Sequence, residues 1–167
     1  MHVHSQAHTQ VAKIDPSLLE LGGVSNRILS LTVNESLNTC EELLGQDLGW
    51  ASLKQLNLQN NLITALDSSL DQLQVVQTIN LSQNQISKIE FMTGCLCLDF
   101  LDLSFNMIES LEGVALGALK ILHLRGNQIF SVNGLENLRA LEELNLAENR
   151  IADYKGMERL RDLPLLS

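Results

Sequence analysis

The sequence predicts an α/β solenoid: a right-handed superhelix with a parallel sheet on its concave side and 3₁₀ or short helical turns on its convex side. The frame LxxLxLxxNxI recurs five times, at intervals of 23, 22, 21 and 22 residues, with Val and Ile replacing leucines in the second copy. Its leucine spacing fits neither one long helix nor one long strand. Because aromatic residues make up only 4% of the chain, the core must consist of branched aliphatic side chains. The five copies start at Leu53, Val76, Leu98, Leu119 and Leu141.

The LxL centre of each copy predicts a short strand. In the third copy, Leu101 and Leu103 should point into the interior, whereas Phe100 and Asp102 should point from the opposite face. Successive copies then stack their strands into one parallel sheet that lines a concave surface. This frame is that of a leucine-rich repeat.

The ninth position of every copy is an asparagine. Because an amide both donates and accepts hydrogen bonds, we expect a ladder of asparagines that pair with backbone groups where the chain leaves the sheet. We interpret this ladder as architecture and not as a binding site. Its members are Asn61, Asn84, Asn106, Asn127 and Asn149.

The second half of each copy should return along the convex side. Apolar residues three to four positions apart favour a 3₁₀ or α-helical turn there. Cys95 occupies one of these apolar positions, so we expect it to be buried, and it should not bridge to Cys97 if the two face opposite sides. The clearest examples are Ile63, Leu66, Leu70 and Leu73 in the first copy and Ile129, Val132, Leu135 and Leu138 in the fourth.

The repeats divide the chain into two predicted regions. Residues 1–27 should be an N-terminal tail and partial cap, and residues 28–167 a repeat domain whose degenerate first copy starts at Ile28. Near the C-terminal end, Leu163 and Leu166 have the spacing that opens a further copy, and we find no cap signal after them. We therefore expect a fragment or short form, monomeric, with self-association through the uncapped end as the alternative.

Bulk properties exclude several functions. The net charge of −9, without a Lys/Arg-rich run, argues against nucleic acid or an anionic membrane as the main partner. We find neither a stretch apolar enough for a transmembrane segment nor a signal peptide. Three cysteines without metal-ligand spacing favour a reducing cytoplasm. We expect no metal and no cofactor, and we interpret His2, His4 and His8 as part of a solvated tail.

Outward-facing strand positions predict a protein-binding surface. Phe100 and Ile121 should be neighbours in its apolar centre, and carboxylates should gather toward the fifth copy, an arrangement typical of interfaces. A protein partner with apolar and basic residues would fit it. For Phe105 two roles stay open, contact with a partner or cover over the strand end. The expected partner-binding residues are Phe100, Asp102, Phe105, Ile121, His123, Arg125, Glu143 and Glu148.

An enzyme is the weaker hypothesis. Its starting point would be a hydrogen bond between Asp102 and His123 on adjacent strands, but we find no nucleophile beside them. We therefore interpret the two residues as a cross-strand polar pair and expect no enzymatic activity.

Residues 53–160 resemble the 22-residue subfamily of leucine-rich repeats through runs such as "INLSQNQISKIE" and "LHLRGNQIFSVNGLENL". Trp50 before the first copy, the 23-residue length of that copy and the run "LDLSFNMIESLEG" are most similar to nischarin and its relatives. A nischarin-like protein would be a non-catalytic scaffold or adaptor that regulates cell migration and Rac signalling. The subfamily also implies two alternatives, a protein phosphatase 1 regulatory adaptor and an axonemal, dynein-associated one. A truncated structural fragment without a partner is the alternative from another class.

Overall fold

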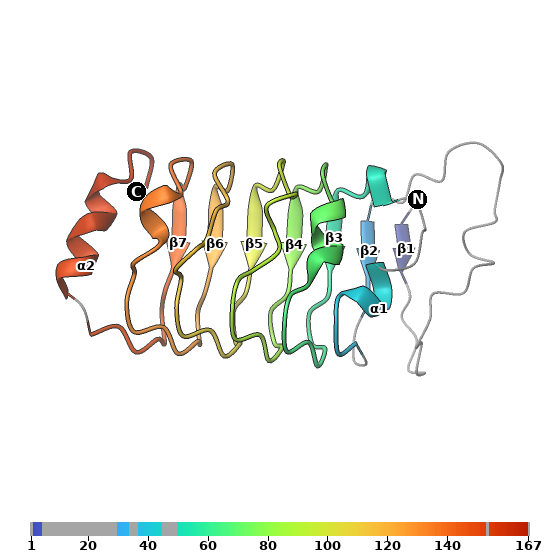
Figure 1. Ribbon diagram of the computed structural model, residues 1–167, viewed down its shortest axis with the longest axis horizontal. Helices are drawn as coiled ribbons and strands as arrows, with labels where there is room; N and C mark the ends of the chain where they lie inside the picture. The colour runs from blue at the N-terminus through green and yellow to red at the C-terminus, as the bar shows by residue number, and fades with distance from the viewer. Residues whose placement is uncertain (1, 5–29, 34–36, 45–49, 153, 167) are drawn as a thin grey trace.

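The strands form one parallel sheet in which each strand pairs with the next along the chain. The computed structural model describes residues 2–4, 30–33, 37–44, 50–152 and 154–166. Figure 1 shows the strands side by side along the long axis of the molecule, so the predicted solenoid is confirmed. The strands are β1 (His2–His4), β2 (Ser30–Thr32), β3 (Gln55–Asn57), β4 (Thr78–Asn80), β5 (Phe100–Asp102), β6 (Ile121–His123) and β7 (Glu143–Asn145).

The convex side is partly helical. The first and fourth clear copies contain 3₁₀ helices, as predicted, whereas the second and third cross this side in turns. The helix of the first copy starts after Asp67, whose side chain caps it by accepting a hydrogen bond from the Ser69 amide at 3.0 Å. The helices are α1 (Glu41–Leu44), η2 (Trp50–Ser52), η3 (Ser68–Gln72), η4 (Leu135–Asn137), α2 (Tyr154–Glu158) and η5 (Arg159–Asp162). None of the described helices has the length and apolarity needed to cross a membrane.

Alternation along each three-residue strand places its central side chain in the core. Leu56, Ile79, Leu101 and Leu122 are in register on β3 to β6 and are fully buried. Leu144 of β7 is only half-buried, so the last strand is less well covered. Residues 163–166 form a turn and no strand, with Leu163 itself buried in the core. Self-association at this end stays a prediction.

At the other end of the sheet, the degenerate copy contributes a strand. Leu31 of β2 pairs in register with Leu56 of β3. Beyond it, β1 pairs with β2, although the sequence shows no repeat around His2–His4. The rest of the predicted tail and cap, residues 5–27, lies outside the described residues.

The asparagine ladder is confirmed, and it joins consecutive repeats. Asn84 Oδ1 accepts from the Ile63 amide at 3.1 Å, while its Nδ2 donates to the carbonyls of Leu58 and Leu81 at 2.9 and 3.0 Å. One side chain thus satisfies buried backbone groups of two copies and holds their strands in register.

The cysteines are all free, and two of them are buried, including Cys95 as predicted. Cys95 Sγ lies 3.4 Å from the Leu70 carbonyl oxygen. Burial, and secondarily the charge of Asp71, raises the pKa of the Cys95 thiol to about 12. Cys95 is therefore a small core residue, whereas Cys97 is exposed.

Candidate protein-interaction site on the concave face

The centre of the candidate site is a pair of apolar side chains on adjacent strands. Phe100 of β5 and Ile121 of β6 are register partners, as predicted, and both are half-buried. The next residues, Leu101 and Leu122, are fully buried, so Phe100 and Ile121 belong to the opposite, outer face of the sheet. Phe100 and Ile121 are therefore neighbours on this face, on the strands of the third and fourth of the five clear copies.

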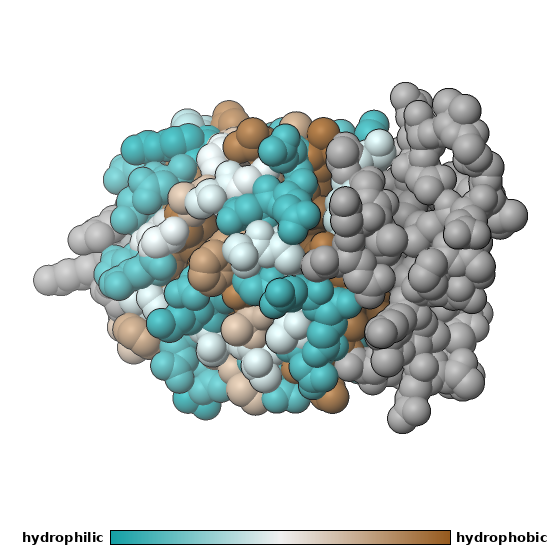
Figure 2. Space-filling model, turned by 45° about the vertical axis from the view of Figure 1, so that its right-hand side comes forward, coloured by the Kyte–Doolittle hydropathy of each residue, from teal (hydrophilic) through white to brown (hydrophobic). Residues whose placement is uncertain are grey.

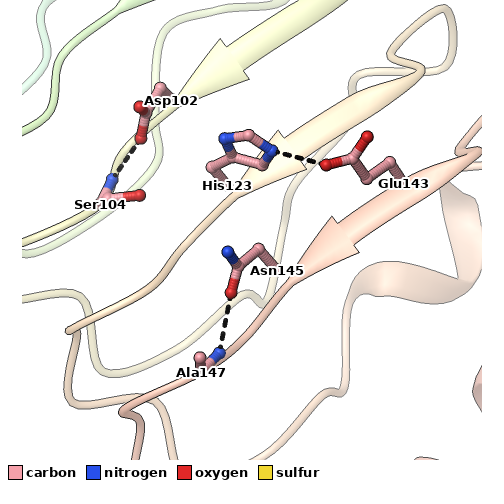
Figure 3. Close-up of polar contacts among 6 residues, drawn as sticks. All are labelled: Asp102, Ser104, His123, Glu143, Asn145 and Ala147. Atoms are coloured by element: carbon pink, nitrogen blue, oxygen red, sulfur yellow. Dashed lines mark hydrogen bonds and ion pairs between the residues drawn. The ribbon is translucent and has the colours of Figure 1, made fainter.

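A first series of side-chain contacts connects Phe100 on β5 with Glu143 on β7 through His123 on β6. The Phe100 and His123 rings meet edge to face, with centroids 5.3 Å apart and an interplanar angle of 77°. His123 Nε2 lies 3.0 Å from Glu143 Oε1, and Figure 3 shows the imidazole turned toward that carboxylate. Glu143 thus orients the ring that packs against Phe100.

A second series of side-chain contacts lies at the carboxyl end of the strands. The Arg125 guanidinium carbon is 5.6 Å from the centroid of the Phe105 ring, a cation–π contact, and Arg125 Nη2 donates to Glu148 Oε1. This hydrogen bond raises the pKa of Arg125 and lowers that of Glu148. Both groups are exposed, so the pair fixes the side chains more than it stabilises the fold.

Phe105 lies on the backbone of the next repeat and not over the core. Its side chain remains 44% exposed, and a Cβ added at Gly126 would come within 2.6 Å of its ring. Glycine at position 126 is thus what allows the ring to lie there. The sequence signal for this contact is a glycine one copy after Phe105, at the same position of the frame.

The predicted pair between Asp102 and His123 is wrong. Asp102 Oδ1 accepts a hydrogen bond from the Ser104 amide at 2.8 Å, and His123 turns away toward Glu143 (Figure 3). Asp102 instead caps the turn that follows β5, because the Ser104 amide lies only two residues further along the chain. The hydrogen bond from which the enzyme hypothesis started is therefore replaced by these two contacts. In the described ranges, no three His, Cys, Asp or Glu side chains are arranged to hold a metal ion.

Exposed apolar side chains also occur away from this site. Figure 2 shows apolar groups separated by hydrophilic ones on one face of the molecule. Single exposed residues of this kind are normal, so exposure alone does not mark a site. The concave centre differs because two apolar residues, Phe100 and Ile121, are adjacent there and the polar side chains beside them are held by hydrogen bonds. The large exposed apolar residues are Leu62, Phe91, Leu96, Phe105, Met107, Phe130, Met157 and Leu165.

Comparison with known proteins agrees with this architecture. The family description "Leucine rich repeat" matches residues 51–108, which contain the first two copies and the strand of the third. The chain is a leucine-rich repeat protein. A leucine-rich repeat protein of Leptospira interrogans superimposes with a TM-score of 0.72 and 30% identity, over 93% of this chain and 39% of that one.

Two of the curated relatives have names that refer to signalling enzymes. Human serine/threonine-protein kinase 11-interacting protein is 39% identical over 131 residues, 72% of this chain and 12% of that protein. An Arabidopsis thaliana homolog of a protein phosphatase 1 regulatory inhibitor subunit is 29% identical over 143 residues, 81% of this chain and 40% of that protein. This leucine-rich repeat chain therefore spans less than half the length of either relative.

Proposed function

We propose that this chain is a non-catalytic adaptor module that binds a protein partner on its concave face. The adjacency of Phe100 and Ile121 on β5 and β6 carries the proposal. The same strand position is polar on the flanking strands, where it holds Gln55, Thr78 and Glu143. An apolar centre between polar strands is the usual organisation of a protein interface. Leucine-rich repeat proteins generally serve as interaction scaffolds, which agrees with this assignment.

The partner segment should combine apolar and basic side chains. Its apolar residues would pack on Phe100 and Ile121, with Phe105 and Arg125 at the rim. The net charge of −9 would attract a basic segment and speed its encounter with the concave face. The three free thiols support a reducing, cytoplasmic location.

The names of two relatives refer to signalling enzymes, a kinase in one name and a phosphatase in the other. We therefore favour a signalling adaptor over a structural fragment without a partner. The Arabidopsis relative supports the phosphatase-regulatory alternative, whereas the nischarin-like role in cell migration and Rac signalling rests on the sequence resemblance alone.

A comparative pulldown from cell lysate tests the proposal. We expect the double variant Phe100→Ala/Ile121→Ala to lose specific preys that wild type recovers. The control Phe91→Ala/Leu96→Ala also removes two exposed apolar side chains, but away from the concave strands, and should recover the same preys as wild type. Equal recovery of every prey by all three proteins would refute the concave site. Loss of a phosphatase catalytic subunit in the first variant would favour the phosphatase-regulatory alternative.

A further inference from the structure

A side-chain cap recurs where the chain leaves the sheet. In four copies, the side-chain oxygen at the last strand residue accepts a hydrogen bond from the amide two residues later. Figure 3 shows the caps of the third and fifth copies. The pairs are Asn57 with Gln59 at 3.0 Å, Asn80 with Ser82 at 3.0 Å, Asp102 with Ser104 at 2.8 Å, and Asn145 with Ala147 at 3.1 Å.

A neutral amide is sufficient for this cap. Three of the four copies use asparagine, and the geometry at Asn80 and Asn145 matches that at Asp102 within 0.3 Å (3.1 against 2.8 Å at most). The fold therefore requires an oxygen acceptor at position 102 but not a negative charge. The charge of Asp102 needs another explanation.

Among the described residues, Asp102 has no ion-pair partner. Its Oδ1 is taken by the Ser104 amide, and within the part of the chain that the structure describes, no basic group pairs with its Oδ2. Its register partners on the adjacent strands are Asn80 and His123, and each of these makes other hydrogen bonds.

Three other carboxylates near the apolar centre differ from Asp102 in this respect, because each has a partner within the chain. These pairs are Glu143 with His123, Glu148 with Arg125, and Asp99 with Lys120 at 3.4 Å. The half-buried carboxylate of Asp102 thus combines an available oxygen with a place beside the apolar centre. A charge that is partly shielded from water interacts more strongly with an opposite charge than one in open solvent.

We propose that Asp102 receives an arginine or lysine side chain of the partner, while neighbouring apolar side chains of that segment pack on Phe100 and Ile121. This inference rests on the proposed function and makes Asp102 its specificity-determining residue. Glu143 and Glu148 are positioning residues that hold their own basic partners against the two phenylalanine rings. The carboxylates that look alike in the sequence thus have two different roles.

The Ser104 amide, hydrogen-bonded to Asp102, is a direct spectroscopic reporter. We would titrate ¹⁵N-labelled protein with the N-acetylated, C-amidated tripeptide leucine–arginine–leucine and, separately, with leucine–glutamine–leucine, up to millimolar concentration. Only the arginine peptide should shift the Ser104 amide resonance, and high salt should abolish that shift because the Debye length falls to about 3 Å at 1 M. Both peptides should shift resonances of Phe100 and Ile121.

Two variants separate the roles of the carboxylates. Asp102→Asn copies the cap of three other repeats, so it should fold as wild type does but lose the arginine-dependent Ser104 shift. Glu142→Gln, which removes the charge of an exposed carboxylate in the fifth copy, should keep it. Shifts at Phe100 and Ile121 without an arginine-dependent shift at Ser104 would overturn this inference and leave the proposed function intact. An absence of shifts in both regions would overturn both, and a response of Ser104 that survives Asp102→Asn would assign the cation to another carboxylate.

Discussion

Replacing Asn106 with alanine should lower the free energy of unfolding by about 1–3 kcal/mol, although the substitution removes four hydrogen bonds. Asn106 Oδ1 accepts from the Ile86 amide at 2.9 Å, and its Nδ2 lies 3.0, 3.0 and 3.3 Å from the carbonyl oxygens of Leu81, Leu103 and Ser104. The side chain is 7% exposed, so water replaces few of these bonds.

The expected loss is modest because the ladder shares its acceptors. The Leu81 carbonyl also accepts from Asn84, and the Leu103 carbonyl also accepts from Asn127, both of which remain in the variant. The Ser104 carbonyl keeps the Gln83 amide. Only the buried Ile86 amide loses its acceptor, and one orphaned backbone donor accounts for about 1–3 kcal/mol.

Asn106→Asp should be more damaging than Asn106→Ala at neutral pH. The carboxylate still accepts from the Ile86 amide, but it places negative charge about 3 Å from backbone carbonyl oxygens and loses the donors that paired with them. Gln85→Ala, at the exposed position beside the ladder, is the control and should be nearly neutral.

Urea unfolding followed by circular dichroism measures all three variants, with a constant m-value as the test that one cooperative unit is compared. A loss for Asn106→Ala below about 0.5 kcal/mol would mean that the Ile86 amide finds another partner. A loss above about 4 kcal/mol would mean that sharing of the carbonyls does not protect the ladder. An aspartate variant as stable as the alanine variant would contradict the argument from charge.

The cysteines and two glycines provide further tests. Iodoacetamide at pH 8 should alkylate Cys97 in the native protein but Cys40 and Cys95 only in urea. Burial, aided by a nearby aspartate, raises the pKa of each of these two thiols to about 12. Mass spectrometry that finds Cys95 modified in the native state would contradict its burial. Gly134→Ala should lower the midpoint of thermal unfolding more than Gly113→Ala does. Both glycines have positive φ, but an added Cβ would lie 2.0 Å from a backbone oxygen at Gly134 and in open space at Gly113, so equal midpoints would show that the backbone conformation alone decides the effect.

Several features of the site were readable from the repeat frame. Counting from the first leucine of each copy places Phe100 and Ile121 at the same strand position, and the structure pairs them in register. The same counting predicts the ladder residue Asn106 and the burial of Leu101. These predictions succeed because a solenoid repeats one local geometry, so that a position in the frame specifies a place in the fold.

The partners of the polar residues were not readable in this way. Strand register places Asp102 opposite His123, but their side chains point to Ser104 and Glu143 instead. Register specifies which backbones are adjacent, whereas the partner of a side chain depends on its rotamer and on every acceptor within reach. The contact between Phe105 and Gly126 was not predicted, for the same reason.

The amino-acid pattern therefore establishes the solenoid, the order of its strands and the outward residues of each, because these follow from alternation and periodicity along the backbone. Which carboxylates have a side-chain partner within the chain depends on side chains of three neighbouring copies meeting in space. Only the folded structure shows that Glu143 and Glu148 are held by His123 and Arg125 while Asp102 keeps an available oxygen. That distinction is a property of distances between repeats, which no position within one repeat encodes.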